Sequence, residues 1–504
     1  MITTLFACSQ LPIIIIWLQC SVIVFVSHSL SRSFSLSFSL PMSQTYRVMV
    51  LEQNQVAPPP NSVPTTSLPL TFFDIPWLLC RPMQRVFFYD LPQPTNHFLQ
   101  AILPSLKHSL SFTLQHFFPF AADLICPPQP LKPHLLYAEG NSVPLTIAEC
   151  AGDFHQLITN GPRDVRELHP FVAQLPPARV SSENTRVIPL MSMQVTLFPN
   201  KGICIGITFC HVAADGRAFH HFIKSWASIF RSRGDLTFLA TSPPLHDKAV
   251  IKDLNGLEPI FLEEWWKWAS TWKEEDSALI HDILANKVRA TFVLGRAHIE
   301  NLKRRVTSEC TTDLEPLHTS TFVVTCALIW VCLIKSQNGG VSNFANNDKL
   351  YYFNFVADCR NRVEFPIPST YFGNCLAICF VSLAGSELVG ETGFFKAVKV
   401  IGDRVSELES GALRGAERWL LDWKEISELG GLVTVAGSPR LGIYDTDFGW
   451  GRPKKSEVVQ IDVSGAISLA ECRDEDGAIE VGLSLSRTDM ISFNAIFEKS
   501  LKLL

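Results

Sequence analysis

His211 and Asp215 are the residues whose types and spacing point most directly to chemistry. They stand four positions apart in the stretch FCHVAADGRAF, residues 209–219, and Gly216 follows at once. Histidine exchanges protons near neutral pH, and a histidine with a nearby aspartate can also supply two metal ligands. Glycine is, in addition, a common turn residue. The stretch therefore fits a catalytic base, part of a metal site, or a structural histidine beside a turn.

The residues around His211 predict a hairpin, a short loop and an amphipathic helix. Apolar and polar residues alternate up to a turn at 200–202, and the run ICIGITF returns as a second strand that ends at His211. From Ala218 on, the apolar residues change to helical spacing: Phe219, Phe222, Ile223, Trp226 and Phe230. We therefore expect His211 where a strand gives way to a loop.

This placement weakens the metal interpretation and a covalent mechanism. No third ligand follows at metal-site spacing, because His220 and His221 fall on the predicted helix and point in different directions. The chain has no GxSxG motif, and Cys210 and His211 would face opposite ways at the end of a strand. We expect no metal and no acyl-enzyme. Spacing alone still leaves open a general base and a structural histidine.

The bulk composition limits the possible classes of protein. The chain has 504 residues, whereas single hydrophobic cores stop growing at about 250 to 300, so we expect two domains of similar size. Its net charge is −5, and its 43 basic and 48 acidic residues form no basic stripe, so we expect no nucleic-acid partner. The 14 cysteines are irregularly spaced and include no CxxC pair, which favours reduced thiols and a cytoplasmic protein.

Residues 1–41 differ from the rest of the chain. The run LPIIIIWLQCSVIVFV at 11–26 is apolar, and a Ser/Leu-rich stretch follows it. No Lys or Arg precedes the run, it is shorter than the roughly 20 residues that span a bilayer, and no small-residue cleavage site is obvious. We expect translation to begin at Met42 and residues 1–41 to lie outside the fold. A genuine targeting segment is the alternative; without one, we expect no membrane partner.

Helices and strands are mixed along the rest of the chain. Residues 231–260 combine Gly, Pro and charge without sustained periodicity, as a crossover between domains would. This mixture predicts an α+β fold. The other elements predicted from periodicity are helices over 104–117, 319–336 and 487–501, a strand from 351 and a hairpin over 466–486.

Two motifs in fixed order resemble a known family. HVAADG at 211–216 and DFGWG at 447–451, preceded by SLPLTFFDIPWL at 67–78, are similar to the paired signature of the BAHD family of plant acyl-CoA-dependent acyltransferases. The resemblance runs from about Ser43 to the C-terminus. YFGNC at 371–375 resembles the branch that acylates glycosides of anthocyanins, flavonoids and other phenolics.

The resemblance implies an architecture. Two similar-sized domains, each a mixed β-sheet with helices as in chloramphenicol acetyltransferase, would be joined by a long crossover loop and separated by a solvent channel. On this basis we expect an N-terminal acyltransferase domain over 42–230 with HVAADG and a crossover linker over 231–260. A C-terminal acyltransferase domain over 261–504 would carry YFGNC and DFGWG.

The resemblance also implies a reaction. His211 would act as general base on a sugar hydroxyl that attacks the thioester of an acyl-CoA co-substrate directly. Malonyl-CoA and a phenolic, flavonoid or anthocyanin glucoside are the expected pair. Hydroxycinnamoyl-CoA on anthocyanin glucosides is the alternative, and a non-catalytic glycoside-binding relative is a third reading. We expect a monomer that binds no permanent cofactor.

Further residues take supporting roles by resemblance. Asp215 would pair with Arg360 or Arg362 and fix the histidine loop, while Gly216 would allow the turn into the helix. The remaining motif residues, expected to be structural, are Asp447, Gly449 and Gly451.

Ligand contacts are the last expectation from the resemblance. Ser438 and Arg440 would line the pantetheine arm, and Arg186 would hold a malonyl carboxylate, with an exposed loop arginine as the alternative. A basic cluster resembles the family's site for the nucleotide phosphates of CoA and consists of Lys303, Arg304 and Arg305. The alternative is that these residues form a solvated basic helix end.

Overall fold

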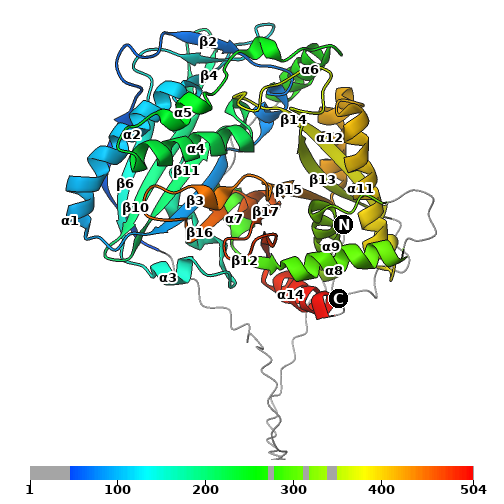
Figure 1. Cartoon of the computed structure of the whole chain (residues 1–504). Helices are drawn as coiled ribbons and strands as arrows, with labels where there is room; N and C mark the ends of the chain where they lie inside the picture. Colours follow the sequence, from blue (N-terminus) through cyan, green and yellow to red (C-terminus); the bar gives the residue numbers. More distant parts are fainter. Residues whose placement is uncertain (1–45, 271–276, 310–316, 338–348, 503–504) are drawn as a thin grey trace, which may run out of the picture. The chain divides into compact units, whose positions relative to one another are not determined.

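A computed structural model of the chain describes residues 46–270, 277–309, 317–337 and 349–502 (Figure 1). The predicted extension over 1–41 and the predicted start at Met42 lie outside these residues. Within the described ranges, the search for a helix with the length and apolar character of a membrane span finds none.

The first sheet has six strands, in the order β1-β6-β10-β11-β3-β16. β6 and β10 run parallel, whereas the other neighbours are antiparallel. The predicted hairpin is confirmed, since β10 and β11 pair from Met191 opposite Phe209 to Phe198 opposite Gly202. The strands are β1 (Val48–Val56), β3 (Met83–Asp90), β6 (Val143–Cys150), β10 (Met191–Phe198), β11 (Gly202–Phe209) and β16 (Lys455–Val458).

Helices α2 (Leu103–His116) and α4 (Gly216–Arg231) lie together against this sheet (Figure 1). Pro104 occupies the first turn of α2, where its missing N–H costs no hydrogen bond. The indole of Trp226 on α4 donates to the Leu106 carbonyl of α2 at 3.3 Å. Both helices match the predicted ones, so α4 starts directly after the loop that carries His211.

The second sheet has seven strands, in the order β14-β13-β15-β17-β18-β12-β7. The predicted strand from 351 is β13, and the predicted C-terminal hairpin is β17 and β18, which pair antiparallel. β15 runs parallel to both of its neighbours, so this sheet is also mixed. The strands are β7 (Arg163–Asp164), β12 (Lys287–Leu294), β13 (Leu350–Asp358), β14 (Leu376–Ala384), β15 (Leu432–Ala436), β17 (Ile467–Glu471) and β18 (Ile479–Ser486).

Helices cover this second sheet. α9 (Thr321–Ser336) is buried almost all round, as its sequence predicts, and packs against α11 (Gly393–Gly411) and the C-terminal helix α14 (Arg487–Lys502). Mixed sheets with helices confirm the predicted α+β class. The other helices are α1 (Thr95–His97), α3 (Phe154–Leu157), α6 (Leu257–Ala269), α7 (Ser277–Leu284), α8 (Arg296–Glu309), α10 (Gly385–Val389), α12 (Trp419–Leu429) and α13 (Ile461–Ser464).

The segment predicted as an irregular crossover, 231–260, holds more structure than its sequence indicates. It contains the short helix α5 (Thr237–Thr241) and a 3-10 helix over Lys248–Val250, and α6 begins within it. Elements this short leave no detectable period in a sequence.

A third sheet of five strands lies in the first half, in the order β2 (Thr66–Pro69), β5 (His134–Tyr137), β4 (Asp123–Cys126), β9 (Arg186–Pro189) and β8 (Arg179–Val180).

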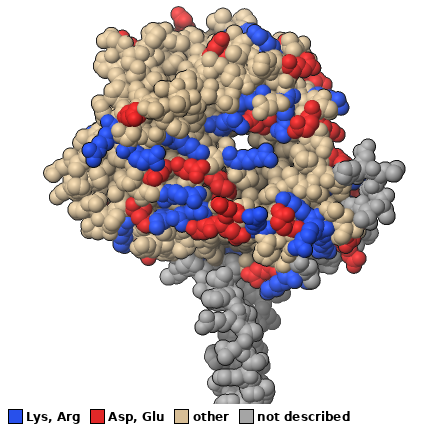
Figure 2. All heavy atoms as spheres, viewed as in Figure 1, with Lys and Arg blue, Asp and Glu red and all other residues tan. Residues whose placement is uncertain are grey.

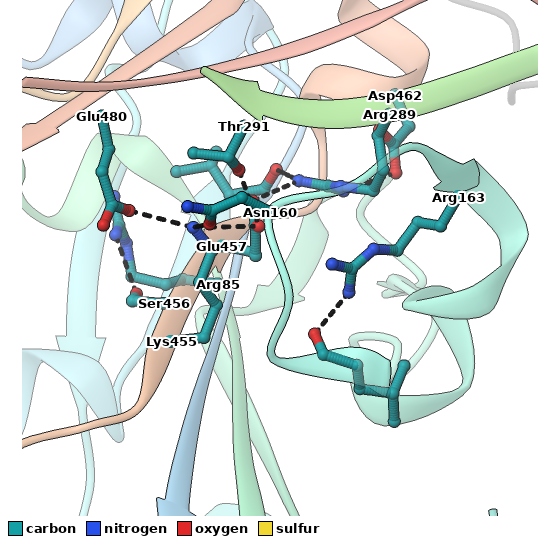
Figure 3. A network of polar contacts seen from close by, with 12 residues as sticks. Arg85, Asn160, Arg163, Arg289, Thr291, Lys455, Ser456, Glu457, Asp462 and Glu480 are labelled. Carbon is teal, nitrogen blue, oxygen red and sulfur yellow. Dashed lines mark hydrogen bonds and ion pairs between the residues drawn. The ribbon is translucent and has the colours of Figure 1, made fainter. Parts of the chain in front are cut away.

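The two large sheets exchange short strands. β16, which follows the DFGWG motif, adds to the edge of the first sheet beside β3, and β7 adds to the second sheet beside β12. A buried ion network surrounds the exchange (Figure 3). Arg289 pairs with Asp462 and with Glu457, both at 2.9 Å, while Lys455 pairs with Glu480 at 3.0 Å. Because loss of one partner would leave a buried charge unpaired, the network holds β16 in place.

Acidic and basic side chains are interspersed on the face shown in Figure 2. This face is hollowed near its centre, and Lys and Arg side chains border the hollow. The mixture agrees with the absence of a basic stripe in the sequence.

Candidate active site

A cavity of about 1090 Å³ is lined by residues from both halves of the chain. His211 and Asp215 line it from the loop after β11, and Arg360 and Tyr371 line it from the loop between β13 and β14. The cavity is large enough for a drug-sized ligand or more. His211, identified from sequence as the candidate base, therefore faces a space that can hold substrates.

The His211 ring is held by an aromatic neighbour. β11 ends at Phe209, and a 3-10 turn over His211–Ala213 follows. Trp77 stacks on the imidazole with ring centroids 4.0 Å apart and planes inclined by 20°. Among the described residues, the imidazole Nδ1 is buried without a hydrogen-bond partner.

The protonation state of His211 suits a base. Burial lowers the pKa of His211 below its ordinary value of 6.5, although the negative charges of Asp215 and Asp74 act in the opposite direction. The imidazole is therefore neutral at neutral pH and can accept a proton. A neutral base beside a substrate-sized cavity can deprotonate an alcohol as it attacks an acyl group.

The backbone of the His211 loop is fixed by Asn374. Its amide Nδ2 donates to the carbonyls of His211 at 3.0 Å and Val212 at 3.2 Å. Both the backbone N–H and the side-chain amide of Asn374 also donate to Asp74 Oδ1 at 3.0 Å. Asp74 and Asn374 are completely buried, so these bonds are shielded from water.

A buried lysine balances the charge of Asp74. Lys248 Nζ lies 3.2 Å from Asp74 Oδ2, and the Lys248 side chain is 5% exposed. Tyr371 lies between two cations, with its ring centroid 5.2 Å from Lys248 Nζ and 6.0 Å from the Arg360 guanidinium carbon. The roles of Trp77, Asp74 and Lys248 were missed from the sequence. The signal was present for the first two, because the motif at 67–78 contains both.

Asp215 fixes the start of α4 and pairs with Arg360. Its Oδ1 accepts the backbone N–H of Ala218 at 2.9 Å as the helix N-cap. Its Oδ2 lies 2.8 Å from Arg360 Nη1 and accepts the N–H of Cys375 at 3.2 Å. Asp215 is 1% exposed, so the pair is buried.

Arg362, the second predicted candidate for this pair, is not the partner. Its Nε donates to Glu409 Oε1 at 2.9 Å instead. The chain turns between the two arginines, where the Arg362 N–H donates to the Cys359 carbonyl at 2.8 Å, so the two side chains point to different neighbours.

Gly216 does not have the role expected from the sequence, which was to allow the turn into the helix. Gly216 is the first residue of α4, and its φ is not positive, so the turn does not require glycine. A Cβ at this position would lie 3.3 Å from Leu441 Cδ1. Gly216 therefore permits a close approach of the segment around Leu441, which also lines the cavity.

The DFGWG motif forms a loop outside the cavity. Asp447 Oδ1 accepts the backbone N–H of Gly449 at 2.7 Å and of Gly451 at 2.9 Å. Both glycines have positive φ, +92° and +86°, which other residues rarely adopt. Phe448 packs edge-on against Trp226 of α4 with centroids 4.9 Å apart. This motif is thus tied to the helix that follows the His211 loop.

The predicted ligand-binding residues separate into two groups. Ser438 and Arg440 line the cavity together with His211. Lys303, Arg304 and Arg186 are not among its lining residues in the described part of the chain.

The residues outside the cavity have other neighbours. On α8, Lys303 pairs with Glu300 at 3.0 Å and Arg304 donates to Asn301. Arg186 lies on β9, opposite Cys126 of β4.

Cys210, next to His211, is not poised as a nucleophile. Burial raises the pKa of its thiol to about 12, so the reactive thiolate is scarce at neutral pH. Its Sγ lies 3.8 Å from the Pro189 carbonyl.

Comparison with known proteins assigns the family. Residues 47–500 match the model described as the Transferase family. The chain is 41% identical to coumaroyl-CoA:anthocyanidin 3-O-glucoside-6''-O-coumaroyltransferase 1 of Arabidopsis thaliana, over 90% of this chain and 97% of that protein. It is 39% identical to malonyl-coenzyme A:anthocyanin 3-O-glucoside-6''-O-malonyltransferase of Dahlia pinnata, over 92% of this chain and 99% of that protein.

A solved structure shows the same fold. Vinorine synthase aligns with a TM-score of 0.63 over 88% of this chain and 96% of that chain, at 19% sequence identity. Fold and sequence together define an acyl-CoA-dependent acyltransferase built on two mixed sheets. The chain belongs to the Transferase family, known as the BAHD acyltransferases.

Proposed function

We propose that this acyltransferase moves a hydroxycinnamoyl group, of the coumaroyl type, from CoA to a sugar hydroxyl of an anthocyanin or other phenolic glucoside. The observation that carries the proposal is the 41% identity, over nine-tenths of the chain, to two coumaroyltransferases that act on anthocyanidin 3-O-glucosides. Malonyl transfer, expected first from the sequence, becomes the second candidate.

The cavity supports an aromatic donor. Its lining includes several aromatic side chains that can contact a planar acyl group: Phe209, Phe219, Phe322 and Phe355. The arginine expected to hold a malonyl carboxylate, Arg186, is not among the lining residues described. An acyl carboxylate at the reaction centre would need a cation elsewhere.

The proposed chemistry is a direct transfer. A nitrogen of the neutral His211 imidazole takes the proton of the sugar hydroxyl while the hydroxyl oxygen attacks the thioester carbonyl. The tetrahedral intermediate expels the CoA thiolate, and the imidazolium then returns its proton to that sulfur. A new ester bond replaces the thioester, and no acyl-enzyme forms. Asp215 supports the loop and does not need to touch the reacting atoms.

Other ligand contacts belong to the same proposal. Ser438 and Arg440, on the cavity wall, would contact the pantetheine arm, whereas Lys303 and Arg304 on α8 would meet the CoA phosphates. Asp447 would support the structure around the site and would not contact the reacting atoms. We also propose a cytoplasmic monomer, in line with the cysteine pattern.

Malonyl-CoA is the second candidate donor. The Dahlia pinnata enzyme, similar over almost the whole chain, is a malonyltransferase, and so are relatives in tobacco and Arabidopsis thaliana. In that case Arg440, which lines the cavity, is the candidate cation for the carboxylate.

One experiment separates the two donors. The purified protein, started at Met42, is incubated with coumaroyl-CoA or malonyl-CoA and a set of phenolic and anthocyanin glucosides, and product masses are read. We expect the coumaroyl increment with kcat/KM at least about tenfold above malonyl. A malonyl increment at equal or higher efficiency would overturn the donor assignment. CoA release that does not depend on the acceptor would instead indicate a hydrolase, and an absence of CoA release with either donor would indicate a non-catalytic binder.

A further inference from the structure

A group of polar side chains that takes no part in the proposed acyl transfer also lines the cavity. Gln84 and Arg85 lie on β3, His220 lies on α4, and Glu471 ends β17, while Gln460 follows β16. All five line the same cavity as His211. The Gln460 Oε1 atom accepts the backbone N–H of Gln84 at 2.8 Å, which fixes the Gln460 side chain beside β3.

Arg85 is a buried cation that keeps hydrogen-bonding capacity. It is 9% exposed, and its Nη1 donates to the neutral Ser456 hydroxyl at 3.1 Å (Figure 3). The neighbouring carboxylates are taken by other cations, Glu457 by Arg289 and Glu480 by Lys455. Burial lowers the pKa of Arg85 to about 10, so it stays charged at neutral pH.

Glu471 is a partly used acceptor in the same cluster. Its Oε1 accepts the N–H of Tyr444 at 3.0 Å, whereas its buried Oε2 has no partner among the described residues. Glu471 and Arg85 both line the cavity, and the negative charge of Glu471 raises the pKa of Arg85. A buried carboxylate oxygen without a donor is costly, so a ligand hydroxyl would stabilise it.

His220 adds a second acceptor. It is 4% exposed, and its Nδ1 lies 2.6 Å from the Gly216 carbonyl, to which only a protonated Nδ1 can donate. Burial and the charge of Arg85 lower the pKa of His220 well below 6.5, so the ring is neutral. Its buried Nε2 is therefore a lone-pair acceptor, and it has no partner among the described residues.

We propose that Arg85, Glu471 and His220, with Gln84 and Gln460, form a subsite that binds the hydroxyls of the glycosyl unit of the acceptor. Each sugar hydroxyl can donate to Glu471 or His220 and accept from Arg85, so one ring satisfies both kinds of group. Arg85 and Glu471 together carry no net charge, so the subsite suits neutral hydroxyls better than the anionic phosphates of CoA or a malonyl carboxylate. The inference rests on the proposed function, because it requires a glycosylated acceptor.

The test compares a phenolic glucoside with its aglycone. Dissociation constants for both are measured by calorimetry with wild-type protein, Glu471→Gln and Arg85→Met, together with KM for the acyl-CoA. Glu471→Gln keeps the size of the side chain and an oxygen for Tyr444, so it should fold even where Arg85→Met does not. Glu425→Gln is the matched control, because Glu425 is exposed on α12 and pairs with Arg418.

The subsite predicts a selective loss. Wild-type protein should bind the glucoside more tightly than the aglycone, and each variant should weaken glucoside binding at least about tenfold with aglycone binding and donor KM within about twofold. If wild-type protein prefers the glucoside and Glu471→Gln retains that preference, the subsite is wrong and the proposed function stands. If wild-type protein binds both equally, the acceptor class and the subsite fail together.

Discussion

Asp215 and Asp447 hold opposite ends of helix α4. Asp215 caps the first turn, where its Oδ1 accepts the N–H of Ala218, and Asp447 Oδ2 lies 3.5 Å from Nη1 of Arg231, the last residue of the helix. The HVAADG and DFGWG motifs, far apart in the sequence, thus meet on one element. Asp447 can therefore influence the His211 loop without lining the cavity.

The Asp215–Arg360 pair should be strongly coupled. Asp215→Asn keeps a helix cap but removes the buried one of the two carboxylates that pair with Arg360, the other being the partly exposed Asp358 at 3.1 Å, so we expect it to lower the free energy of unfolding by up to about 3–5 kcal/mol. Urea unfolding of Asp215→Asn, Arg360→Gln and the double variant would measure the coupling. The exposed pair of Lys396 and Glu387, 2.9 Å apart and without contact to Asp215 or Arg360, is the control and should couple by less than about 1 kcal/mol. Equal coupling in the two pairs would contradict this account.

Asn374 should act as a positioning residue. Asn374→Leu removes the bonds to the carbonyls of His211 and Val212, and a small displacement of the base costs rate, so we expect kcat to fall about tenfold to a hundredfold with little change in KM. Asn354→Leu is the matched control. Asn354 is also completely buried and donates to the Cys379 carbonyl at 3.1 Å, and it is not among the residues that line the cavity in the described part of the chain.

Both asparagine variants should lose about 1–3 kcal/mol of stability. Only Asn374→Leu should lose kcat when rates are normalised to folded protein. A similar fall in kcat for both variants would show that Asn374 has a merely structural role.

Gly373 should resist substitution for two reasons. Its φ is +148°, and a Cβ would lie 2.5 Å from Lys248 Nζ, which Asp74 holds in place. Gly140, with φ of +92° and open space around its Cβ position, isolates the backbone cost. Thermal or urea unfolding should show Gly373→Ala about 1–3 kcal/mol less stable than Gly140→Ala. No difference between them would mean that the lysine moves freely.

The pH dependence of kcat/KM should report His211. Its pKa is lowered by burial, and the base works when neutral, so activity should be constant near pH 7 and fall only as the pH drops through a value below 6.5. The negative charge of Asp215 raises this pKa, so Asp215→Asn should move the acid limb to still lower pH. An acid limb above pH 6.5, or a shift to higher pH in the variant, argues against His211 as the titrating base.

Local periodicity predicted most of the elements around the site. The hairpin of β10 and β11, helix α4 and the strand-end position of His211 all follow from spacing within one short segment. Spacing alone could not separate a catalytic from a structural histidine, because that depends on the cavity. The cavity is formed by residues such as Tyr371 and Ser438, which are distant from His211 in sequence.

Contacts between residues far apart in the sequence explain the features that periodicity did not predict. Arg360 and Arg362 are equivalent in sequence, and only the turn at Cys359 decides which one meets Asp215. The exchange of β16 into the first sheet depends on burial of Lys455 and Glu457, charged residues that composition places at the surface. Neither relationship leaves a periodic signal.

The turnover of His211→Ala tests the central claim most directly. Transfer to a glucoside acceptor is measured with the wild-type protein and with His211→Ala, whose fold is verified by circular dichroism and by an unchanged donor binding constant. Loss of the general base should lower kcat by about 10²–10⁴-fold and leave a folded, donor-binding protein. If His211→Ala keeps most of its turnover, His211 is not the base.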